Sequence, residues 1–383
     1  MKILVDENIP LVNEFFGGLG EVVKRPGRTM TAVDAQDASA LLVRSVTKVN
    51  QALLNESSVQ FVGTCTIGID HLDLDYFQEK GITYSSAPGC NANSVVEYVY
   101  AALCHLDVSW IGKRFGIIGC GNVGGLLHQR LKLQGVDCYC YDPLRDNLVD
   151  DDLTSLEEVL SCDIISMHTP LTTTGDHPSF HLIGLNELQQ LKTGAVLINA
   201  GRGAVIDNAA LNEFLTQRHD VRVVLDVWEP EPHISLALLD KVDLGSPHIA
   251  GYSYDGKLKG TEMIYQALCR HLNRPAHITL QDLVPALEDN LLSIDESLSV
   301  WEQAKQLIAQ VYDIKADDAR MRALAADAKT QADTRDFFGK GFDGLRKHYP
   351  VRREFHNYRV AVQSPESEAA TWFAALGFKL EHA

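Results

Sequence analysis

Four side chains in the middle of the sequence are of kinds that move protons or hold anions. Arg202 stands in NAGRGAVID, Glu229 and Glu231 stand in DVWEPEP, and His248 stands in SPHIAGYS. A histidine titrates near neutral pH and can take a proton from a hydroxyl group, while a neighbouring carboxylate fixes its tautomer. An arginine offers a rigid fork of donors that suits a carboxylate or a carbonyl oxygen. Each of them alone would more simply be a solvated side chain, so their assignment depends on the shared setting.

The two glutamates are alternatives as partners of the histidine. They stand two residues apart, and such residues face the same way in an extended chain. Pro230 and Pro232 break that regularity, so the spacing leaves both Glu229 and Glu231 open.

A glycine-rich loop earlier in the chain predicts a dinucleotide site. In RFGIIGCGNVGGLLHQRL a GxGxxG pattern follows an apolar strand and opens a helix, so that a pyrophosphate can meet the helix N-terminus. Asp142 ends the next strand, where its carboxylate would accept from a ribose hydroxyl and repel a 2′-phosphate, which favours NAD over NADP. The loop residues expected to bind NAD are Gly119, Gly121, Asn122, Val123 and Gly124.

The elements that must position these side chains form two series of alternating strands and helices. Short apolar runs alternate with amphipathic stretches, which is typical of parallel sheets. Strands are predicted at 2–6, 40–45, 60–64 and 82–87, and then at 114–119, 137–142, 163–168, 195–200, 222–227 and 243–248. Helices are predicted at 49–57, 72–80, 94–106, 254–272 and 299–324, with a strand-like run at 355–363.

We therefore predict an α/β fold of two doubly wound parallel-sheet domains, Rossmann-like or flavodoxin-like, followed by a C-terminal α+β domain. The predicted boundaries are 1–93 and 247–280 for a discontinuous substrate-binding domain, 94–246 for the NAD-binding domain and 281–383 for the C-terminal domain. The arginine, the glutamates and the histidine each follow a strand of the second series, at the edge where open parallel sheets bind ligands.

This combination predicts oxidation of a hydroxyl group by hydride transfer. Such a reaction needs a substrate held in register with the nicotinamide, a base for the hydroxyl proton and compensation of the developing charge. One arginine, one acid and one histidine at successive strand ends supply these needs, and we predict that His248 is the base.

The composition excludes several other classes of protein. The chain has 383 residues and a formal net charge of −17, which argues against nonspecific binding to nucleic acid or to anionic membranes. The start MKILVDENIP does not have the pattern of a signal peptide, and there is no uncharged apolar run of membrane-spanning length. The eight cysteines are scattered without a CxxC pair, so we expect free thiols, a cytoplasmic location and no metal site.

With GxGxxG, NAGRGAVID, DVWEPEP and SPHIAGYS in this order, the chain resembles the D-2-hydroxyacid dehydrogenase family over about residues 1–275. The resemblance implies that Arg202 and Glu231 are catalytic and that His248 is the general acid/base; it favours Glu231 because the family's acid is the fifth residue after the strand-end Asp226. It also implies a homodimer formed through the C-terminal domain. The implied NAD contacts are Asp142, Thr169, Ala200, Arg202, Asp226 and Gly251, and the implied substrate contacts are Ser45, Thr66 and Tyr252.

Stretches such as LLVRSVTKVN, SSAPGCNANSVVEYV and HIAGYSYDGKLKGTEMIYQA narrow the resemblance to one branch of the family, whose substrate is a four-carbon 2-hydroxy acid with a terminal phosphate. The segment DVSWIGKRF is shorter than is usual in the family, which should alter packing and not the chemistry. A phosphate needs cationic groups, and the candidates are Arg44, Lys257, Lys259, Arg346, Lys347, Arg352 and Arg353. We hypothesise that one or more of the last four reaches the phosphate from a partner subunit; the alternative is a solvated or dimer-facing basic surface.

Two other functions remain as alternatives. Another enzyme of the family would act on 3-phosphoglycerate, glycerate or hydroxypyruvate. An NAD-sensing interaction protein would not need its catalytic side chains, yet Arg202 and His248 both stand in a suitable context.

Overall fold

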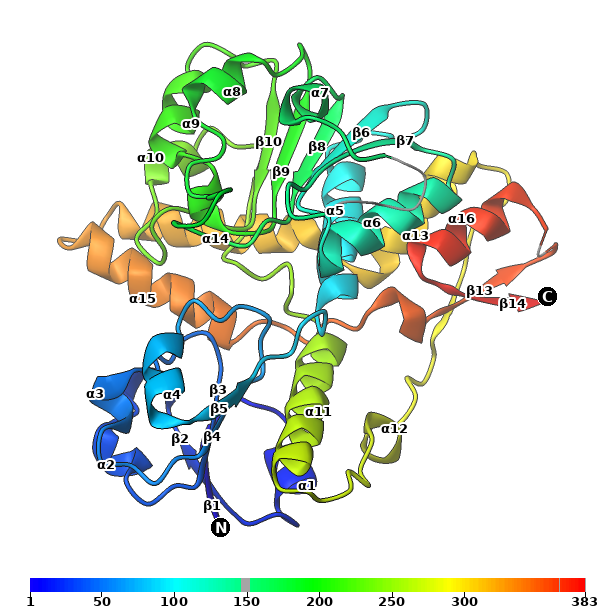
Figure 1. Cartoon of the computed structure of the whole chain (residues 1–383). Helices are drawn as coiled ribbons and strands as arrows, with labels where there is room; N and C mark the ends of the chain where they lie inside the picture. Colours follow the sequence, from blue (N-terminus) through cyan, green and yellow to red (C-terminus); the bar gives the residue numbers. More distant parts are fainter. Residues whose placement is uncertain (146–151, 365, 383) are drawn as a thin grey trace. The chain divides into compact units, whose positions relative to one another are not determined.

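The computed structural model describes residues 1–145, 152–364 and 366–382. The chain forms two compact units, one of residues 1–91 and 253–286 and the other of residues 92–252 and 287–383. Figure 1 shows a sheet with helices on its faces in each unit. All strand pairs of these sheets are parallel, which confirms the predicted α/β class.

The first unit contains a five-stranded sheet in the order β2-β1-β3-β4-β5, as in flavodoxin-like folds. Its strands are β1 (Lys2–Asp6), β2 (Glu21–Arg25), β3 (Ala40–Val43), β4 (Phe61–Thr64) and β5 (Thr83–Ser85). Its helices are α1 (Val12–Phe16), α2 (Ala32–Ala35), α3 (Gln51–Leu54), α4 (Leu74–Lys80), α11 (Tyr254–His271) and α12 (Leu280–Leu283). Ile3 and Leu4 enter separate cores on the two faces of this sheet, with Leu268 and Phe77 respectively. Because both faces are covered, most of these strands are continuous apolar runs that the sequence reveals.

Strand β2 is absent from the predicted set. It lies at the edge of the sheet, and none of its residues is fully buried. Its sequence, EVVKR, is charged at both ends, as edge strands commonly are, and therefore has only a weak apolar signal.

The second unit contains a six-stranded sheet in the order β11-β10-β9-β8-β6-β7. Its strands are β6 (Arg114–Ile118), β7 (Asp137–Tyr141), β8 (Ile164–Met167), β9 (Val196–Asn199), β10 (Arg222–Leu225) and β11 (Leu244–Gly245). A bridge between Cys140 and Leu153 adds a short parallel partner to β7. The strand order reverses beside β6, which lies between β7 and β8, and such a switch point is where open α/β sheets bind ligands.

Helices cover both faces of this second sheet. They are α5 (Ala92–His105), α6 (Asn122–Leu133), α7 (Leu156–Leu160), α8 (Leu185–Gln189), α9 (Asn208–Phe214) and α10 (Leu236–Leu239). Ile117 of β6 belongs to the core that contains Leu131 of α6, while its neighbour Ile118 belongs to the core that contains Leu188 of α8. Strand β6 is thus buried on both of its faces, and the glycine loop begins directly after its last residue.

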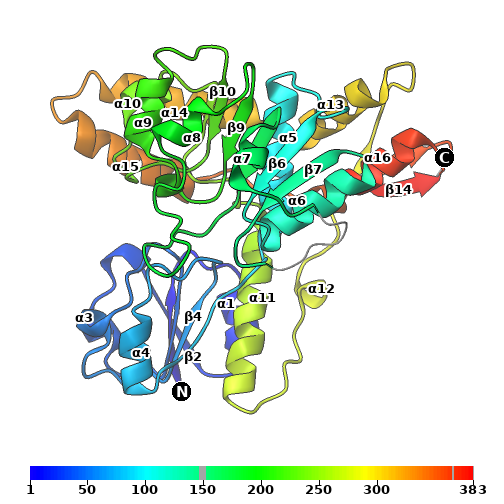
Figure 2. The same ribbon diagram turned by 45° about the horizontal axis from the view of Figure 1, so that its top comes forward.

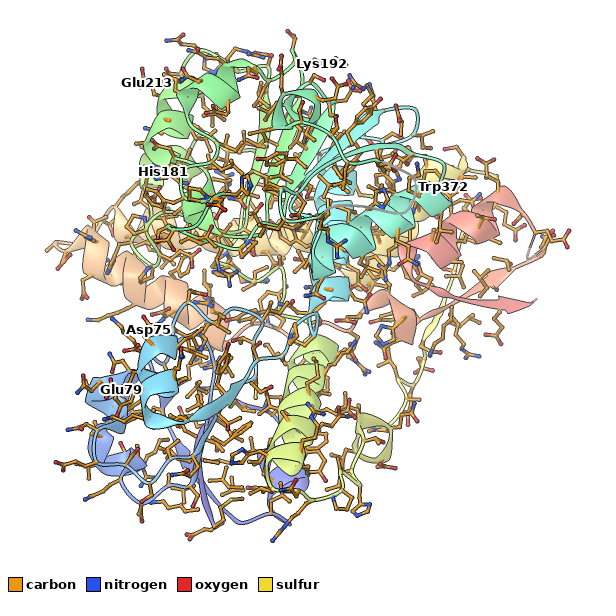
Figure 3. The ribbon with its side chains drawn as sticks, viewed as in Figure 1. Asp75, Glu79, His181, Lys192, Glu213 and Trp372 are labelled. Carbon is orange, nitrogen blue, oxygen red and sulfur yellow. The ribbon has the colours of Figure 1, made fainter. Side chains whose placement is uncertain are left out.

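Residues 287–383 add an α+β segment to the second unit. It has a three-stranded parallel sheet in the order β12-β13-β14, formed by β12 (Leu291–Leu292), β13 (Arg359–Val362) and β14 (Lys379–His382). Its helices are α13 (Val300–Val311), α14 (Ile314–Ala328), α15 (Thr334–Lys347) and α16 (Glu368–Leu376). Figures 1 and 2 both show α16 beside α6, and Figure 3 labels Trp372 of α16. The ring of Trp372 stacks on that of Trp110, with 5.8 Å between centroids, so the expected α+β C-terminal part shares a core with the second sheet's helices.

Three further observations bear on the sequence predictions. Residues 247–252, which the predicted boundaries place in the substrate-binding domain, lie in the second unit because the carboxylate of Asp226 accepts hydrogen bonds from the amides of Ile249 and Ala250. All eight cysteines are free thiols, and all but Cys104 are buried. Within the described residues, no helix is long and apolar enough to cross a membrane.

Candidate active site

The glycine loop at the end of β6 has the geometry that a pyrophosphate needs. Gly119 has a φ of 85°, and a Cβ atom there would lie 2.9 Å from the amide nitrogen of Thr169. A Cβ atom on Gly124 would lie 2.0 Å from the carbonyl oxygen of Gly119. A Cβ atom on Gly121, in contrast, would meet nothing within 4 Å, and α6 begins at the next residue, Asn122. Two glycines therefore permit the tight turn, and the third keeps the helix N-terminus open to a ligand.

Asp142 lies at the end of β7, next to that loop. One carboxylate oxygen accepts a hydrogen bond from the amide of Cys120 (2.9 Å), and the other accepts from the amide of Leu144 (3.1 Å). The carboxylate is thus fixed beside the loop with lone pairs to spare for a ribose hydroxyl, and its charge disfavours a 2′-phosphate.

The other expected cofactor residues follow neighbouring strands of the same sheet. Thr169 follows β8 and donates from its hydroxyl to the carbonyl of Ile118 (3.2 Å), and Ala200 follows β9 and donates its amide to the carbonyl of Met167 (3.3 Å). Asp226 follows β10, and Gly251 follows β11. Because the carboxyl ends of parallel strands share an edge, the structure brings these residues to the edge that holds the glycine loop.

Arg202 lies in a loop after β9, between two glycines whose lack of a side chain permits close backbone contacts. A Cβ atom on Gly203 would lie 1.8 Å from the carbonyl oxygen of Trp228, so the two loops touch through their backbones. The side chain of Asn199 clamps the turn, since it donates to the carbonyl of Arg202 (3.0 Å) and accepts from the amide of Gly201 (3.1 Å). The half-buried guanidinium is thereby presented from a fixed backbone.

Asp226 organises the backbone around the histidine. Its side chain is only 1% exposed and accepts hydrogen bonds from Ser246 Oγ (2.6 Å), the Ile249 amide (2.8 Å) and the Ala250 amide (2.9 Å). The Asp226 carbonyl accepts from the amide of His248 (2.7 Å). His248 has a φ of 58°, an unusual conformation that these surrounding bonds hold in place.

His248 and Glu231 form a direct pair. Nδ1 of His248 lies 2.7 Å from Oε2 of Glu231, and Oε1 of Glu231 accepts from the amide of Trp228 (3.0 Å). Burial alone would raise the pKa of the Glu231 carboxyl, but the charge and hydrogen bond of His248, with help from Arg346 and the Trp228 amide, hold that pKa below its usual value. An ionised carboxylate can only accept, so Nδ1 carries a proton and Nε2 is the nitrogen that can exchange one with a substrate.

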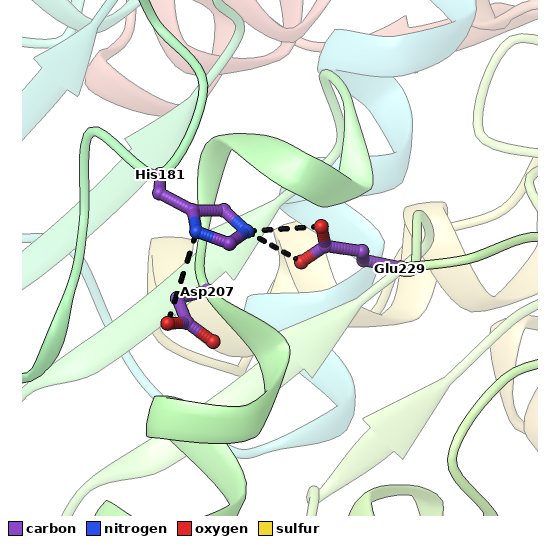
Figure 4. A group of neighbouring side chains, drawn as sticks. All are labelled: His181, Asp207 and Glu229. Carbon is purple, nitrogen blue, oxygen red and sulfur yellow. Dashed lines mark hydrogen bonds and ion pairs between the residues drawn. The ribbon is translucent and has the colours of Figure 1, made fainter.

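Glu229, the other candidate, has a different partner. Both of its carboxylate oxygens lie 2.9 Å from Nε2 of His181, and Nδ1 of His181 lies 3.8 Å from Oδ2 of Asp207. Figure 4 shows His181 between the two carboxylates. His181, Asp207 and Glu229 are all residue types that bind metals. The two carboxylates meet opposite nitrogens of the ring, which is the arrangement of a hydrogen-bonded chain and not of ligands around one ion. The sequence held no signal for this cluster, because its members come from three separate segments.

Arg346 lies near the pair of His248 and Glu231, a place that the sequence did not reveal. Its guanidinium carbon lies 5.4 Å from the centroid of the Tyr252 ring, and its charge contributes to the lowered pKa of Glu231. It belongs to α15, far along the chain from the strand ends, so no local motif links it to them.

The other basic candidates have different surroundings. Arg352 is only 5% exposed and donates to Ser94 Oγ (2.6 Å) and to the carbonyl of Ala250 (2.8 Å), so it does not fit the phosphate hypothesis. Arg353 donates to the side-chain oxygen of Asn357 (2.8 Å), and Lys347 is exposed.

The expected substrate residues Ser45 and Thr66 belong to the first unit, where they follow the neighbouring strands β3 and β4. The hydroxyl oxygen of Thr66 lies 2.8 Å from that of Thr64. Arg44 donates to the buried carboxylate of Asp6 (3.0 Å), so its charge is already paired.

Comparisons with known proteins agree with this geometry. Residues 102–250 match the family model described as D-isomer specific 2-hydroxyacid dehydrogenase, NAD binding domain, and residues 283–377 match a domain of unknown function. The chain is 64% identical to an erythronate-4-phosphate dehydrogenase of Cellvibrio japonicus, with 99% of this chain and 100% of that protein covered. It is 47% identical to the enzyme of the same name from Pseudomonas entomophila, with 99% of each covered.

Solved structures show the same fold at lower identity. A D-lactate dehydrogenase from Aquifex aeolicus, in complex with NAD and lactic acid, aligns with a TM-score of 0.61 at 23% identity, covering 71% of this chain and 96% of that one. An NAD-bound 3-phosphoglycerate dehydrogenase from Entamoeba histolytica aligns with a TM-score of 0.62 at 21% identity, covering 73% of this chain and 98% of that one.

Proposed function

Because the chain belongs to the family of erythronate-4-phosphate dehydrogenases, NAD-dependent members of the D-2-hydroxyacid dehydrogenases, we propose that it oxidises 4-phospho-D-erythronate at C2 to 2-oxo-3-hydroxy-4-phosphobutanoate. The observation that supports the chemistry most directly is the 2.7 Å pair of His248 and Glu231 at the sheet edge that carries the glycine loop.

The proposed mechanism divides the work among these residues. Nε2 of His248 takes the proton of the C2 hydroxyl, and Glu231 stabilises the imidazolium that forms. Arg202 holds the substrate carboxylate and compensates the charge that develops on the C2 oxygen. When bound at the glycine loop, NAD would supply the acceptor for the hydride of C2, and the hydroxyl carbon would become a ketone.

The proposed cofactor contacts rest on the loop geometry and on position at the sheet edge. They are Gly119, Gly121, Asn122, Val123, Gly124, Asp142, Thr169, Ala200, Arg202, Asp226 and Gly251. The proposed substrate contacts are Ser45 and Thr66 of the first unit and Tyr252 of the second.

We also propose that the protein is a cytoplasmic homodimer that serves the synthesis of pyridoxal 5′-phosphate. The C-terminal segment is proposed as the dimerisation domain, and the exposed apolar side chains of Leu291, Phe337 and Val351 in that segment are compatible with a covered surface. Sedimentation equilibrium of the whole chain tests this assignment, because a monomeric mass would contradict it.

Single-turnover reduction of NAD with enzyme in excess tests the activity. The acids to compare are 4-phosphoerythronate, erythronate, 3-phosphoglycerate and D-lactate, each with wild type and with His248→Asn. Fast reduction with 4-phosphoerythronate alone, lost in the variant, is the expected result. Reduction with 3-phosphoglycerate instead would keep the mechanism and overturn the substrate. No reduction with any acid would favour the NAD-sensing alternative.

A further inference from the structure

A cationic side chain from the C-terminal segment lies beside the catalytic pair. Arg346 stands in the last turn of α15, within the residues that match the domain of unknown function, while the dehydrogenase family model ends at residue 250. Its guanidinium carbon lies 5.4 Å from the centre of the Tyr252 ring, and Tyr252 follows His248 in the same loop. The C-terminal segment thus contributes a charge to a site whose other members come from the sheet edge.

The guanidinium is held in place, and one of its nitrogens has no partner in the described part of the chain. Its Nε is buried and has no hydrogen-bond partner among the described residues. Burial alone would lower the pKa of Arg346, yet Tyr252, Glu231 and Asp343 together raise it above the usual value. A permanently charged fork with an unused donor is suited to a phosphate, which accepts two parallel N–H bonds.

The other members of the basic cluster have different surroundings. Arg352 is buried and donates to Ser94 and to the carbonyl of Ala250, and Arg353 donates to Asn357. Lys347 is exposed and carries a compact ammonium in place of a fork. Arg352 also contacts the loop of His248 and has nitrogens unpaired within the described residues, but it is only 5% exposed, whereas Arg346 is half-buried beside Tyr252, where a ligand can reach it.

We propose that Arg346 binds the terminal phosphate of the substrate and sets the preference for phosphorylated over unphosphorylated 2-hydroxy acids. This inference rests on the proposed function for the identity of the acid. In this proposal the C-terminal segment helps to select the substrate. The arginine that does so belongs to the same chain as His248.

The test compares a phosphorylated acid with its unphosphorylated counterpart in wild type, Arg346→Gln, Arg346→Lys and the neighbouring exposed control Lys347→Gln. We expect Arg346→Gln to lower kcat/KM for 4-phosphoerythronate by about 100-fold, mainly through KM, because a charge-assisted pair is lost. The value for erythronate should change little, Arg346→Lys should recover part of the loss, and Lys347→Gln should behave as wild type. NADH affinity serves as the control for folding.

Equal losses for both acids would overturn the proposal, since Arg346 would then only position Tyr252 or Glu231. Unchanged kinetics for both acids would overturn it as well. A binding measurement separates this failure from failure of the proposed function: inorganic phosphate should bind to wild type with NADH present and bind at least about tenfold more weakly to Arg346→Gln. If wild type does not oxidise 4-phosphoerythronate but that difference persists, the substrate assignment fails and the phosphate site stands.

Discussion

Nδ1 of His248 lies 2.7 Å from Oε2 of Glu231, whereas Glu229, two residues earlier, contacts His181 through both of its oxygens at 2.9 Å. Two glutamates of one short loop are therefore directed to two different histidines. The amide of Trp228 donates a hydrogen bond to the carboxylate of Glu231. The amide of Glu229 donates to Asn208 Oδ1 (3.1 Å), which holds the Glu229 backbone in place. The loop is held in place at both glutamates, and only one of them meets His248.

The matched substitutions Glu231→Gln and Glu229→Gln should therefore differ sharply. Loss of the Glu231 charge removes the group that orients His248 and stabilises its imidazolium, so kcat should fall by on the order of 100-fold. Glu229→Gln keeps an acceptor for His181 and should retain most of the activity. Steady-state kinetics with saturating NAD measures both, and comparable losses would contradict the division of roles.

The pH dependence of stability provides an independent check on the same pair. The pKa of Glu231 in the folded protein lies below its ordinary value of 4.5 because the pair with His248 outweighs burial. A carboxyl with a depressed folded pKa contributes stability that is present above the unfolded pKa and is lost as the pH falls through the folded pKa. The difference in thermal midpoint between wild type and Glu231→Gln should therefore be constant near neutral pH and shrink below about pH 4.5. A difference that grows on acidification would refute the assignment.

The glycine loop separates a folding role from a binding role. Gly124→Ala places a Cβ atom 2.0 Å from the Gly119 carbonyl oxygen and should lower the thermal midpoint. Gly121→Ala places its Cβ atom in open space, so the fold should survive while the KM for NAD rises, because the methyl group enters the path of the pyrophosphate. A Gly121→Ala enzyme with wild-type KM for NAD would show that the cofactor passes elsewhere.

Arg352 is expected to matter for folding and not for substrate choice. Its guanidinium lies 4.1 Å from the centroid of the Tyr312 ring and donates to Ser94 Oγ and the Ala250 carbonyl. Arg352→Met would remove these two buried hydrogen bonds from a charged donor, so we expect a loss of about 3 kcal/mol in the free energy of unfolding. The exposed pair of Lys340 and Asp336 provides the control, since Lys340→Met should leave the free energy of unfolding nearly unchanged. Equal effects of the two substitutions on unfolding by urea would show that burial of Arg352 is not decisive.

Much of the fold follows from local patterns. Strands buried on both faces are continuous apolar runs, so most strands of the two large sheets were predicted close to their observed positions. The edge strand β2 was not predicted, because charged residues replace apolar ones at a sheet edge. Residues 247–252 were expected in the substrate-binding domain but lie in the second unit. The hydrogen bonds that join them to Asp226 connect residues distant in sequence, so local patterns do not reveal them.

The sequence by itself determined the glycine loop, the strand-end Asp142 and the order of Arg202, the glutamates and His248, because each depends on a short motif at a strand end. Spacing alone could not choose between Glu229 and Glu231, because Pro230 and Pro232 remove the regular alternation on which such a choice depends. The family resemblance favoured Glu231, and the tertiary structure brings that residue to His248. Only the tertiary structure decided that Arg352 is buried and that Arg346 reaches Tyr252. Those contacts join residues from 17 to 258 positions apart in the sequence, and they are fixed by how helices and loops pack against the sheet rather than by any neighbour in the chain.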